Sequence, residues 1–593
     1  MTENLHDTLF ELRRRKLDGY LWIDVICIDQ SNTTERSEQV LLMDSIYTLA
    51  RQVIIWLGKE QSDLVHYHDM LKRYKAIFER GEMQQRYDFS FSPSDPGFLQ
   101  AWGFSAGEYQ QQYHSLSLFF YRCRWFSRIW VVQEFALAQE LYIICGFTTL
   151  DHDEEFIPFC LAILMSMALP RWPSIVQLEG VWNRLDSRTR SKQKQQHLQS
   201  YYAMFRAETA IQYWYAYMIT LLEELRGFEA SDACDKVYAV YGIANKLSSP
   251  YKPPFLTANS VNYKASCEYV YKTFAQDALT HLPTLAMLSF AVGVGPQKPA
   301  LLPSWCPDYR RSVPIWHTSS LPLQEHERAT QTVPCSYSAS GTWNRLPPFN
   351  SISDGVLSVM GRAIGTIKKI SAQLITSPNH GPSIRLDPNA FISLACSLDT
   401  VYHLTGEDRL EVLWRTTLCN TITGLAALDE SRCQFKDPAP SGTVEWFKSL
   451  VLYASANILA SLDDEHRPPY IYQLRLRNEE FADSSVVLPS VSETVQLEQE
   501  IRAGTINVAD FQIAEFFSRE ATVHCRNRRF ILMDNACFGL ALVMTQPGDE
   551  VWLLQCAKAI RPAPARGWPL LSRGRGLRPR AHAWRSGQWS RRP

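Results

Sequence analysis

The chain has 593 residues, of which 46% are hydrophobic, 12% aromatic and 20% charged. This composition excludes a disordered, collagen-like or coiled-coil protein, and the length suggests roughly three to five domains. The net charge is −1, but residues 551–593 hold Lys558, nine arginines and no acidic residue, so residues 1–550 carry −11. We therefore expect no nucleic-acid partner apart from contacts of the basic tail.

The 14 cysteines are scattered and include no Cys-x-x-Cys pair, so neither a zinc ribbon nor a disulfide scaffold is expected. We predict no metal site. The first residues, MTENLHDTLFELRRRK, lack the apolar stretch of a signal peptide. The most apolar run, residues 156–170, is shorter than the roughly 18 residues of a membrane span, so we interpret it as a buried helix. We expect a cytoplasmic protein without membrane association.

The first element is LWIDVICI at 21–28, a nearly continuous β-branched run that is typical of a strand buried on both faces. Apolar residues at helical spacing predict a helix over 34–50, with Thr34 as its cap. VIIWLG at 53–58 predicts a second buried strand. Strand, helix and strand in this order predict a right-handed parallel crossover.

An inserted helix and loop are predicted for the polar residues 59–114. Residues 125–140 predict a helix capped by Ser127, and LYIICG at 141–146 predicts another buried strand. Residues 1–150 should therefore form an α/β domain with an open, mainly parallel sheet of at least three strands.

Downstream of residue 150 the expected organisation changes several times along the chain. We predict a helical region at 151–300, with helices at 156–168, 199–226 and 262–281, and a helical region at 391–519. Between them, 301–390 should contain loops and short strands. Residues 520–556 predict a small β-rich module, and 557–593 a basic disordered tail.

Several acidic and polar residues of the first domain are candidates for a ligand site. Ligands of an open parallel sheet bind outside the carboxyl ends of its strands, where Asp29 and Gln30 are expected. Asp24, inside the predicted strand, must be paired or hydrogen-bonded. Glu134, on a mostly apolar helix, should have a raised pKa or a basic partner. Trp130 should share its helix face, whereas Arg128, six residues earlier, should not.

Three ordered blocks of this chain resemble the fungal heterokaryon-incompatibility (HET) domain. They are the W-I-D-x-x-C-I-D-Q block at Trp22–Gln30, the E-R helix with its W-L-G strand at Glu35–Gly58, and the R-x-W-x-x-Q-E block at Arg128–Glu134. Residues 232–244, 302–310 and the 520–556 module resemble further parts of such proteins. HET domains usually open with a strand ending in a Y-x-x-L-S-Y-x-W-G block, and we expect this first strand to be missing here.

The resemblance implies a role in non-self recognition and vegetative incompatibility, in which the domain triggers regulated cell death with a protein partner or by self-association. HET domains are similar to TIR domains, so it also implies a TIR- or flavodoxin-like sheet. TIR domains that cleave NAD use a glutamate in a similar helix. Glu134 is then the catalytic candidate, with Asp24, Asp29 and Gln30 as binding candidates; Arg128, Trp130 and Gln133 complete that set.

Three interpretations of these residues stay open. In the first, the domain is an NAD glycohydrolase whose carboxylate stabilises an oxocarbenium-like ribose; NAD is then a substrate, and no cofactor is evident. In the second, the domain is a non-catalytic self-associating module. In the third, Arg128, Trp130 and Glu134 only lock the helix to the sheet, and Asp24 and Asp29 are structural.

Overall fold

The structure is a computed structural model. Its described residues fall in separate ranges with isolated gaps, together with a few single residues between them: 3–59, 123–150, 209–247, 261–291, 302–310, 350–372, 389–418, 443–505, 528–554 and 561–563. The predicted helix at 156–168, almost all of the predicted insertion at 59–114 and most of the basic tail lie outside the described residues.

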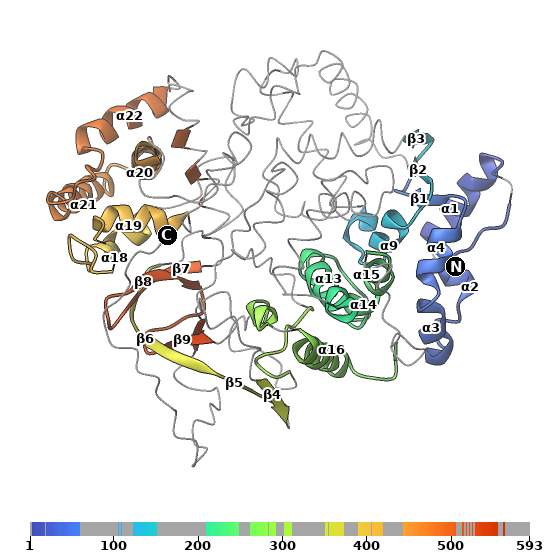
Figure 1. The fold of residues 1–593 in the computed structure, drawn as a ribbon. Coiled ribbons are helices and arrows are strands. Elements are labelled where there is room, and N and C mark those ends of the chain that lie inside the picture. Colours follow the sequence, from blue (N-terminus) through green and yellow to red (C-terminus); the bar gives the residue numbers. More distant parts are fainter. Residues whose placement is uncertain are drawn as a thin grey trace, which may run out of the picture.

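The first domain contains a three-stranded sheet of order β1-β2-β3 (Figure 1). Strand β1 (Val53–Trp56) pairs in parallel with β2 (Leu141–Cys145), and β3 (Thr148–Leu150) pairs antiparallel with β2. The strands predicted at 53–58 and 141–146 are therefore confirmed. β3 follows at once because Gly146 adopts a φ of +55° in the turn, a conformation that costs glycine little.

The strand predicted at 21–28 is wrong. Residues 24–27 form a single helical turn, α2 (Asp24–Cys27), in which Val25 is 49% and Ile26 57% exposed. The amides of Cys27 and Ile28 donate to the carbonyls of Ile23 and Asp24, at 2.8 and 3.0 Å. Because these local bonds satisfy the backbone groups, the segment has no strand partner in the described sheet. The parallel crossover joins β1 to β2 instead of 21–28 to 53–58.

The helix predicted at 34–50 forms as two helices, α3 (Thr33–Val40) and α4 (Met43–Leu49), separated by a turn. The cap is Asn32 and not Thr34. The Asn32 side-chain oxygen accepts from the amides of Thr34 and Glu35, at 3.1 and 3.2 Å. A preceding helix, α1 (Glu3–Arg14), is tied to the sheet because Arg15 donates to Thr149 Oγ1 at 2.6 Å.

The helix predicted at 125–140 is also broken, into the 3-10 turn η1 (Arg124–Ser127) and α9 (Val131–Ala136). Ser127 does not cap α9. The break arises because the Ile129 amide donates to the carbonyl of Glu229 at 2.8 Å, which makes residue 128 part of a short parallel bridge. A long-range contact thus replaces the helical bond that the local sequence favours.

The middle of the described chain is helical, and its helices lie beside α9, on the side away from α1 (Figure 1). One hydrophobic core joins the two parts, since Ile55, Phe135 and Ile143 belong to the same cluster as Tyr217 and Tyr271. The helices of this part are α13 (Ala210–Glu224), α14 (Asp235–Tyr238), α15 (Tyr241–Leu247), α16 (Cys267–His281) and the 3-10 turn η4 (Ala286–Ser289).

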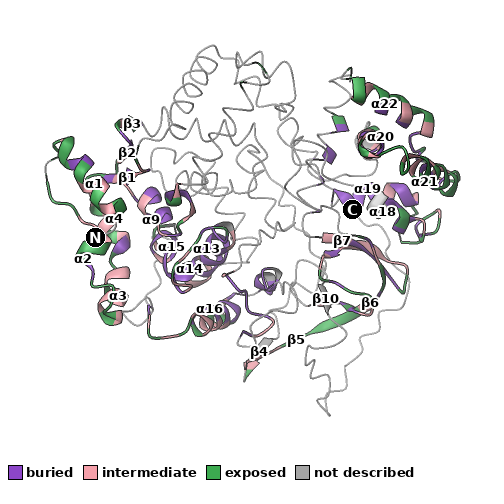
Figure 2. Ribbon diagram, turned by 180° about the vertical axis from the view of Figure 1, so that it is seen from behind, coloured by how far each residue is buried: buried purple, intermediate pink, exposed green. Residues whose placement is uncertain are grey.

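The C-terminal part combines helices with an antiparallel five-stranded sheet of order β10-β9-β6-β7-β8. Its core includes Trp414, Phe447 and Phe530, all fully buried. The helix at Arg409–Thr417 is mostly buried, whereas the helix at Arg467–Glu480 is mostly exposed (Figure 2). The elements are β4 (Asn350–Ser353), β5 (Val356–Val359), β6 (Gly361–Ile370), α18 (Asn389–Ala395), α19 (Arg409–Thr417), α20 (Thr443–Ser461), α21 (Arg467–Glu480), α22 (Val491–Ala503), β7 (Arg528–Met533), β8 (Phe538–Leu542), β9 (Glu550–Leu554) and β10 (Arg561–Ala563).

Strand β10 corrects the prediction that residues 557–593 are wholly disordered. Arg561 to Ala563 pair with Trp552 to Glu550 of β9, so the start of the basic tail forms an edge strand. The fold is thus a mixed one: a small sheet with a parallel pair near the N-terminus, helices in the middle and a β-rich C-terminal region. In the part of the chain that the structure describes, no helix is both long and apolar enough to cross a membrane.

Candidate functional site

Glu134 lies in α9, a helix whose other side chains are almost all buried. Val131, Val132 and Phe135 are fully buried in the core, which leaves the Glu134 side chain on the half-buried side of the helix. The indole Nε1 of Trp125 donates a hydrogen bond to Glu134 Oε2 at 3.3 Å. Burial raises the pKa of Glu134, and this outweighs the opposing effects of Arg128 and Trp125. The expected raised pKa is therefore present.

Asp24 reaches the same site although its predicted strand does not form. It begins α2, and its carboxylate further raises the pKa of Glu134. Both carboxylates also act on Tyr47 of α4, whose phenol pKa is raised well above its usual range, chiefly by burial. The Trp22 ring packs edge-on against Tyr47, with ring centroids 6.1 Å apart. Two acids and three aromatic side chains, including Trp125, thus form one cluster.

Arg128 supplies the positive charge of this cluster, contrary to the expectation that it lies away from Glu134. The expectation assumed one continuous helix, whereas residue 128 ends η1 in an extended conformation, with φ −79° and ψ 133°. From there its guanidinium lowers the pKa values of both Glu134 and Tyr47, while its backbone bridges to Glu229.

Asp29 and Gln30 are not at the end of a strand, because no strand precedes them. Asp29 Oδ1 accepts hydrogen bonds from the Ser31 hydroxyl at 2.6 Å and the Ser31 amide at 3.0 Å, and these bonds lower its pKa. The Asp29 amide donates to Glu35 Oε1 at 3.1 Å, and Gln30 Nε2 lies 3.5 Å from the Asp24 carbonyl oxygen. These contacts close the turn between α2 and α3.

Trp130 and Gln133 both contact residues 232–244. Trp130 hydrogen-bonds the carboxylate of Asp235. Gln133, 1% exposed, donates through Nε2 to the carbonyl of Ala239 at 2.8 Å. Trp130 remains in helical register with Glu134, whose amide donates to the Trp130 carbonyl at 3.3 Å, while the side chain that bonds the Glu134 carboxylate is that of Trp125. Trp130 and Gln133 lock α9 to the downstream helices.

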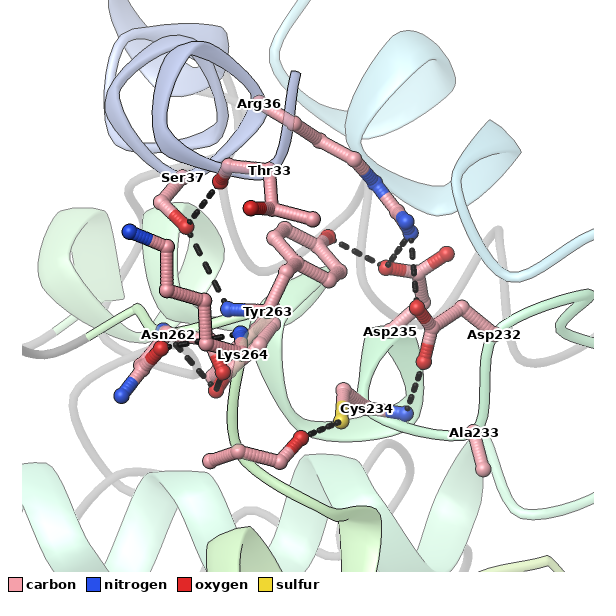
Figure 3. A network of polar contacts seen from close by, with 12 residues as sticks. Thr33, Arg36, Ser37, Asp232, Ala233, Cys234, Asp235, Asn262, Tyr263 and Lys264 are labelled. Carbon is pink, nitrogen blue, oxygen red and sulfur yellow. Dashed lines mark hydrogen bonds and ion pairs between the residues drawn. The ribbon is translucent and has the colours of Figure 1, made fainter. Parts of the chain in front are cut away.

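A second polar network, centred on Asp235, joins α3 to the same downstream segment (Figure 3). Arg36 Nη2 lies 3.1 Å from Asp232 Oδ2 and 3.5 Å from Asp235 Oδ1, and its guanidinium stacks 3.6 Å above the Tyr263 ring. The Tyr263 hydroxyl donates to Asp235. The Tyr263 amide donates to Ser37 Oγ at 3.3 Å. Arg36, Asp232, Asp235 and Tyr263 are called the Arg36 clasp below.

The sequence reasoning missed Trp22, Tyr47 and Trp125 as members of the Glu134 cluster. Trp22 starts the first of the singled-out blocks, and Trp125 starts the helix predicted at 125–140, so their positions in these segments were the available signal. A carboxylate pair bordered by aromatic rings and one guanidinium is chemically suited to a ligand that combines an aromatic ring with positive charge. The raised pKa of Glu134 is the kind of perturbation that accumulates at functional sites.

Comparison with known proteins identifies the first part of the chain. Residues 1–134 match the family model described as Heterokaryon incompatibility protein (HET). Heterokaryon incompatibility protein 6, OR allele, of Neurospora crassa is 32% identical over 164 residues, a match covering 25% of this chain and 24% of that protein. The chain thus spans about a quarter of the relative's length. No solved structure matches the chain significantly. Residues 1–134 are a fungal heterokaryon-incompatibility domain.

Proposed function

We propose that this protein acts in heterokaryon incompatibility, as a non-self recognition protein whose HET domain triggers regulated cell death. The observation that carries the proposal is the family match over residues 1–134, supported by the similarity to a heterokaryon incompatibility protein. The cell-death step, a cytoplasmic location and a protein partner or self-association are parts of the proposal.

The downstream helices would then hold or position the effector domain. This division of labour is supported by the shared hydrophobic core and by the contacts of Trp130 and Gln133 with residues 232–244. Through such contacts, binding of a partner to the downstream region would change the positions of the residues in the Glu134 cluster.

Expression of the full-length chain in a filamentous fungus tests this function. Induction should arrest growth and permeabilise cells, and Glu134→Gln should abolish the effect while protein levels stay equal. Glu140→Gln is the matched control, because Glu140 is an exposed acid just beyond α9. Normal growth on induction of the wild-type chain, at levels at which related HET-domain proteins kill, would reject the proposal.

A second candidate is cleavage of NAD by a TIR-like arrangement of the domain. It is favoured by Glu134, which lies with Asp24 and Arg128 among aromatic rings and leads into a parallel strand pair. In this reaction the bond between ribose and nicotinamide breaks, a carboxylate stabilises the cationic ribose, and water adds to give ADP-ribose and a proton. Glu134 would be the catalytic carboxylate, with Asp24 and Arg128 binding the substrate; Asp29 and Gln30 are not needed.

Nicotinamide release by the purified full-length chain separates the candidates. NAD cleavage predicts release that disappears in Glu134→Gln and persists in Glu140→Gln. A non-catalytic, self-associating domain instead predicts that toxicity survives Glu134→Gln and is lost when surface packing is disrupted. Toxicity lost in Glu134→Gln without any nicotinamide release would reject NAD as the substrate while leaving the incompatibility function in place.

A further inference from the structure

The segment from α2 to α3, residues 24–40, is attached to the protein in an unusual way. Between Asp24 and Val40 only Ile28 is buried, and neither helix contains a buried side chain. Of this segment only Val40, at its end, is among the partly buried side chains that pack on the main core. Apolar burial, which stabilises most helices, therefore contributes little to the position of this segment.

Polar contacts to the downstream region supply the attachment that apolar packing does not. The Arg36 clasp joins the middle of α3 to the α14 region through two carboxylates and the Tyr263 ring. Ser37, one residue later, accepts from the Tyr263 amide at 3.3 Å (Figure 3). Asp235 is 6% exposed and also binds Trp130, so its position is set by the core, whereas Arg36 belongs to the loosely packed segment.

The other end of the segment contributes to the Glu134 cluster. Asp24 starts α2 and acts on Glu134 and Tyr47, and Gln30 links the following turn back to the Asp24 carbonyl. Movement of α3 away from Asp235 would therefore move Asp24 with it, because the turn between them is closed by local hydrogen bonds.

We propose that the Arg36 clasp is a latch through which the downstream segments 232–247 and 261–264 hold the α2–α3 segment closed beside Glu134. Release of Arg36 opens residues 24–40 locally and removes Asp24 from the cluster, while the sheet and α9 stay folded. The latch is a conformational device that needs no particular chemistry at Glu134. It therefore goes beyond the proposed function and can be tested without any activity.

Hydrogen exchange of the full-length protein, read by mass spectrometry, tests the latch. Arg36→Gln should accelerate exchange of amides in 24–40 about tenfold, while amides of β2 remain within about threefold of wild type. In Arg36→Lys, which keeps the charge, exchange of amides in 24–40 should be faster than in wild type and slower than in Arg36→Gln. Arg13→Gln is the matched control, because Arg13 is an exposed arginine of α1, and it should change neither region.

Asp232→Asn provides a second route if Arg36→Gln accumulates poorly, since the Asp232 side chain is 33% exposed and its loss removes the 3.1 Å ion pair. It should accelerate the same amides by a smaller factor. Unchanged protection of 24–40 in both variants would overturn the latch. Equal acceleration in 24–40 and β2 would also overturn it, because the clasp would then be part of the global fold. Glu134→Gln should leave exchange of 24–40 unchanged, so loss of the proposed function does not mimic loss of the latch.

Discussion

The indole of Trp125 donates a hydrogen bond to Glu134, with 3.3 Å between Nε1 and Oε2, across a break in the helix that the sequence predicts as continuous. The break turns Trp125 and Arg128 toward the carboxylate and Trp130 toward Asp235. One block of sequence thus supplies residues to the candidate site and to the contact that anchors it.

Glu134 should destabilise the protein at neutral pH. Burial raises its pKa above the ordinary 4.5, so the folded state binds its proton more tightly than the unfolded chain does. The protein then loses stability as the pH rises from about 4.5 through the raised pKa of Glu134. We expect Glu134→Gln to be more stable than wild type at pH 7 by about 1 kcal/mol, as is common when a functional group is removed.

Denaturant titrations at several pH values measure this difference. The advantage of Glu134→Gln should shrink as the pH falls and vanish below about pH 4, where the carboxyl is protonated in both states. Glu140→Gln, at an exposed acid just beyond α9, is the matched control. A constant difference across the pH range would mean that titration of Glu134 is not its source.

Gly242, in α15, marks the contact of this helix with α4 and α9. A Cβ atom there would lie 2.5 Å from the Asp44 Cβ and 3.3 Å from the Gln133 amide group. Gly242→Ala should therefore cost about 2 kcal/mol through overpacking. Thermal or denaturant unfolding checks the value, and Gly227→Ala, where a Cβ meets nothing within 4 Å, should be close to neutral.

Lys236 should be a structural residue of the downstream block. It is 7% exposed, and its Nζ donates to the carbonyl of Arg226 at 3.0 Å and to that of Phe228, just beyond the end of α13. Lys236→Met fills the same space without a donor, so we expect a loss of about 2 kcal/mol because buried carbonyls lose their partner. Lys264→Met, at an exposed lysine, should change the unfolding midpoint little.

Glu498 should stabilise the C-terminal helices with the opposite pH dependence to Glu134. Its fully buried carboxylate accepts two hydrogen bonds from Arg467, each 2.7 Å long, and these lower its pKa. Glu498→Gln should cost about 2 kcal/mol at pH 7, the usual size for a charge-assisted bond. A lowered pKa gives stability that is present above pH 4.5 and lost on acidification.

Hydrogen exchange of amides in α20 and α22 measures the opening of the C-terminal helices and so tests this contribution. The difference in stability between wild type and Glu498→Gln should shrink as the pH falls from the ordinary pKa of glutamate through the lowered pKa of Glu498. Glu500→Gln, two residues away and more exposed, should have little effect. An equally large effect of Glu500→Gln would contradict the assignment.

Strands β1 and β2 could be predicted from the sequence because each is a short apolar run whose burial dictates its conformation. LWIDVICI has the same pattern but forms α2, since a strand also requires a partner, and nothing in its own residues supplies one. The ends of the helices were predicted wrongly for a related reason. The cap at Asn32 and the bridge to Glu229 depend on hydrogen bonds that the local spacing of apolar residues does not reveal.

Local pattern was therefore enough to predict strands β1 and β2 and to single out the acidic residues Asp24 and Glu134, because burial and propensity act over a few neighbouring residues. The HET domain was indicated by the resemblance of three ordered blocks and not by these patterns. The partners of those acids depended on long-range packing. Trp125 and Arg128 meet Glu134, and Arg36 meets Asp235, only after distant segments fold together. The packing of the shared core determines which side chains of such segments meet, and this packing depends on all of the segments together.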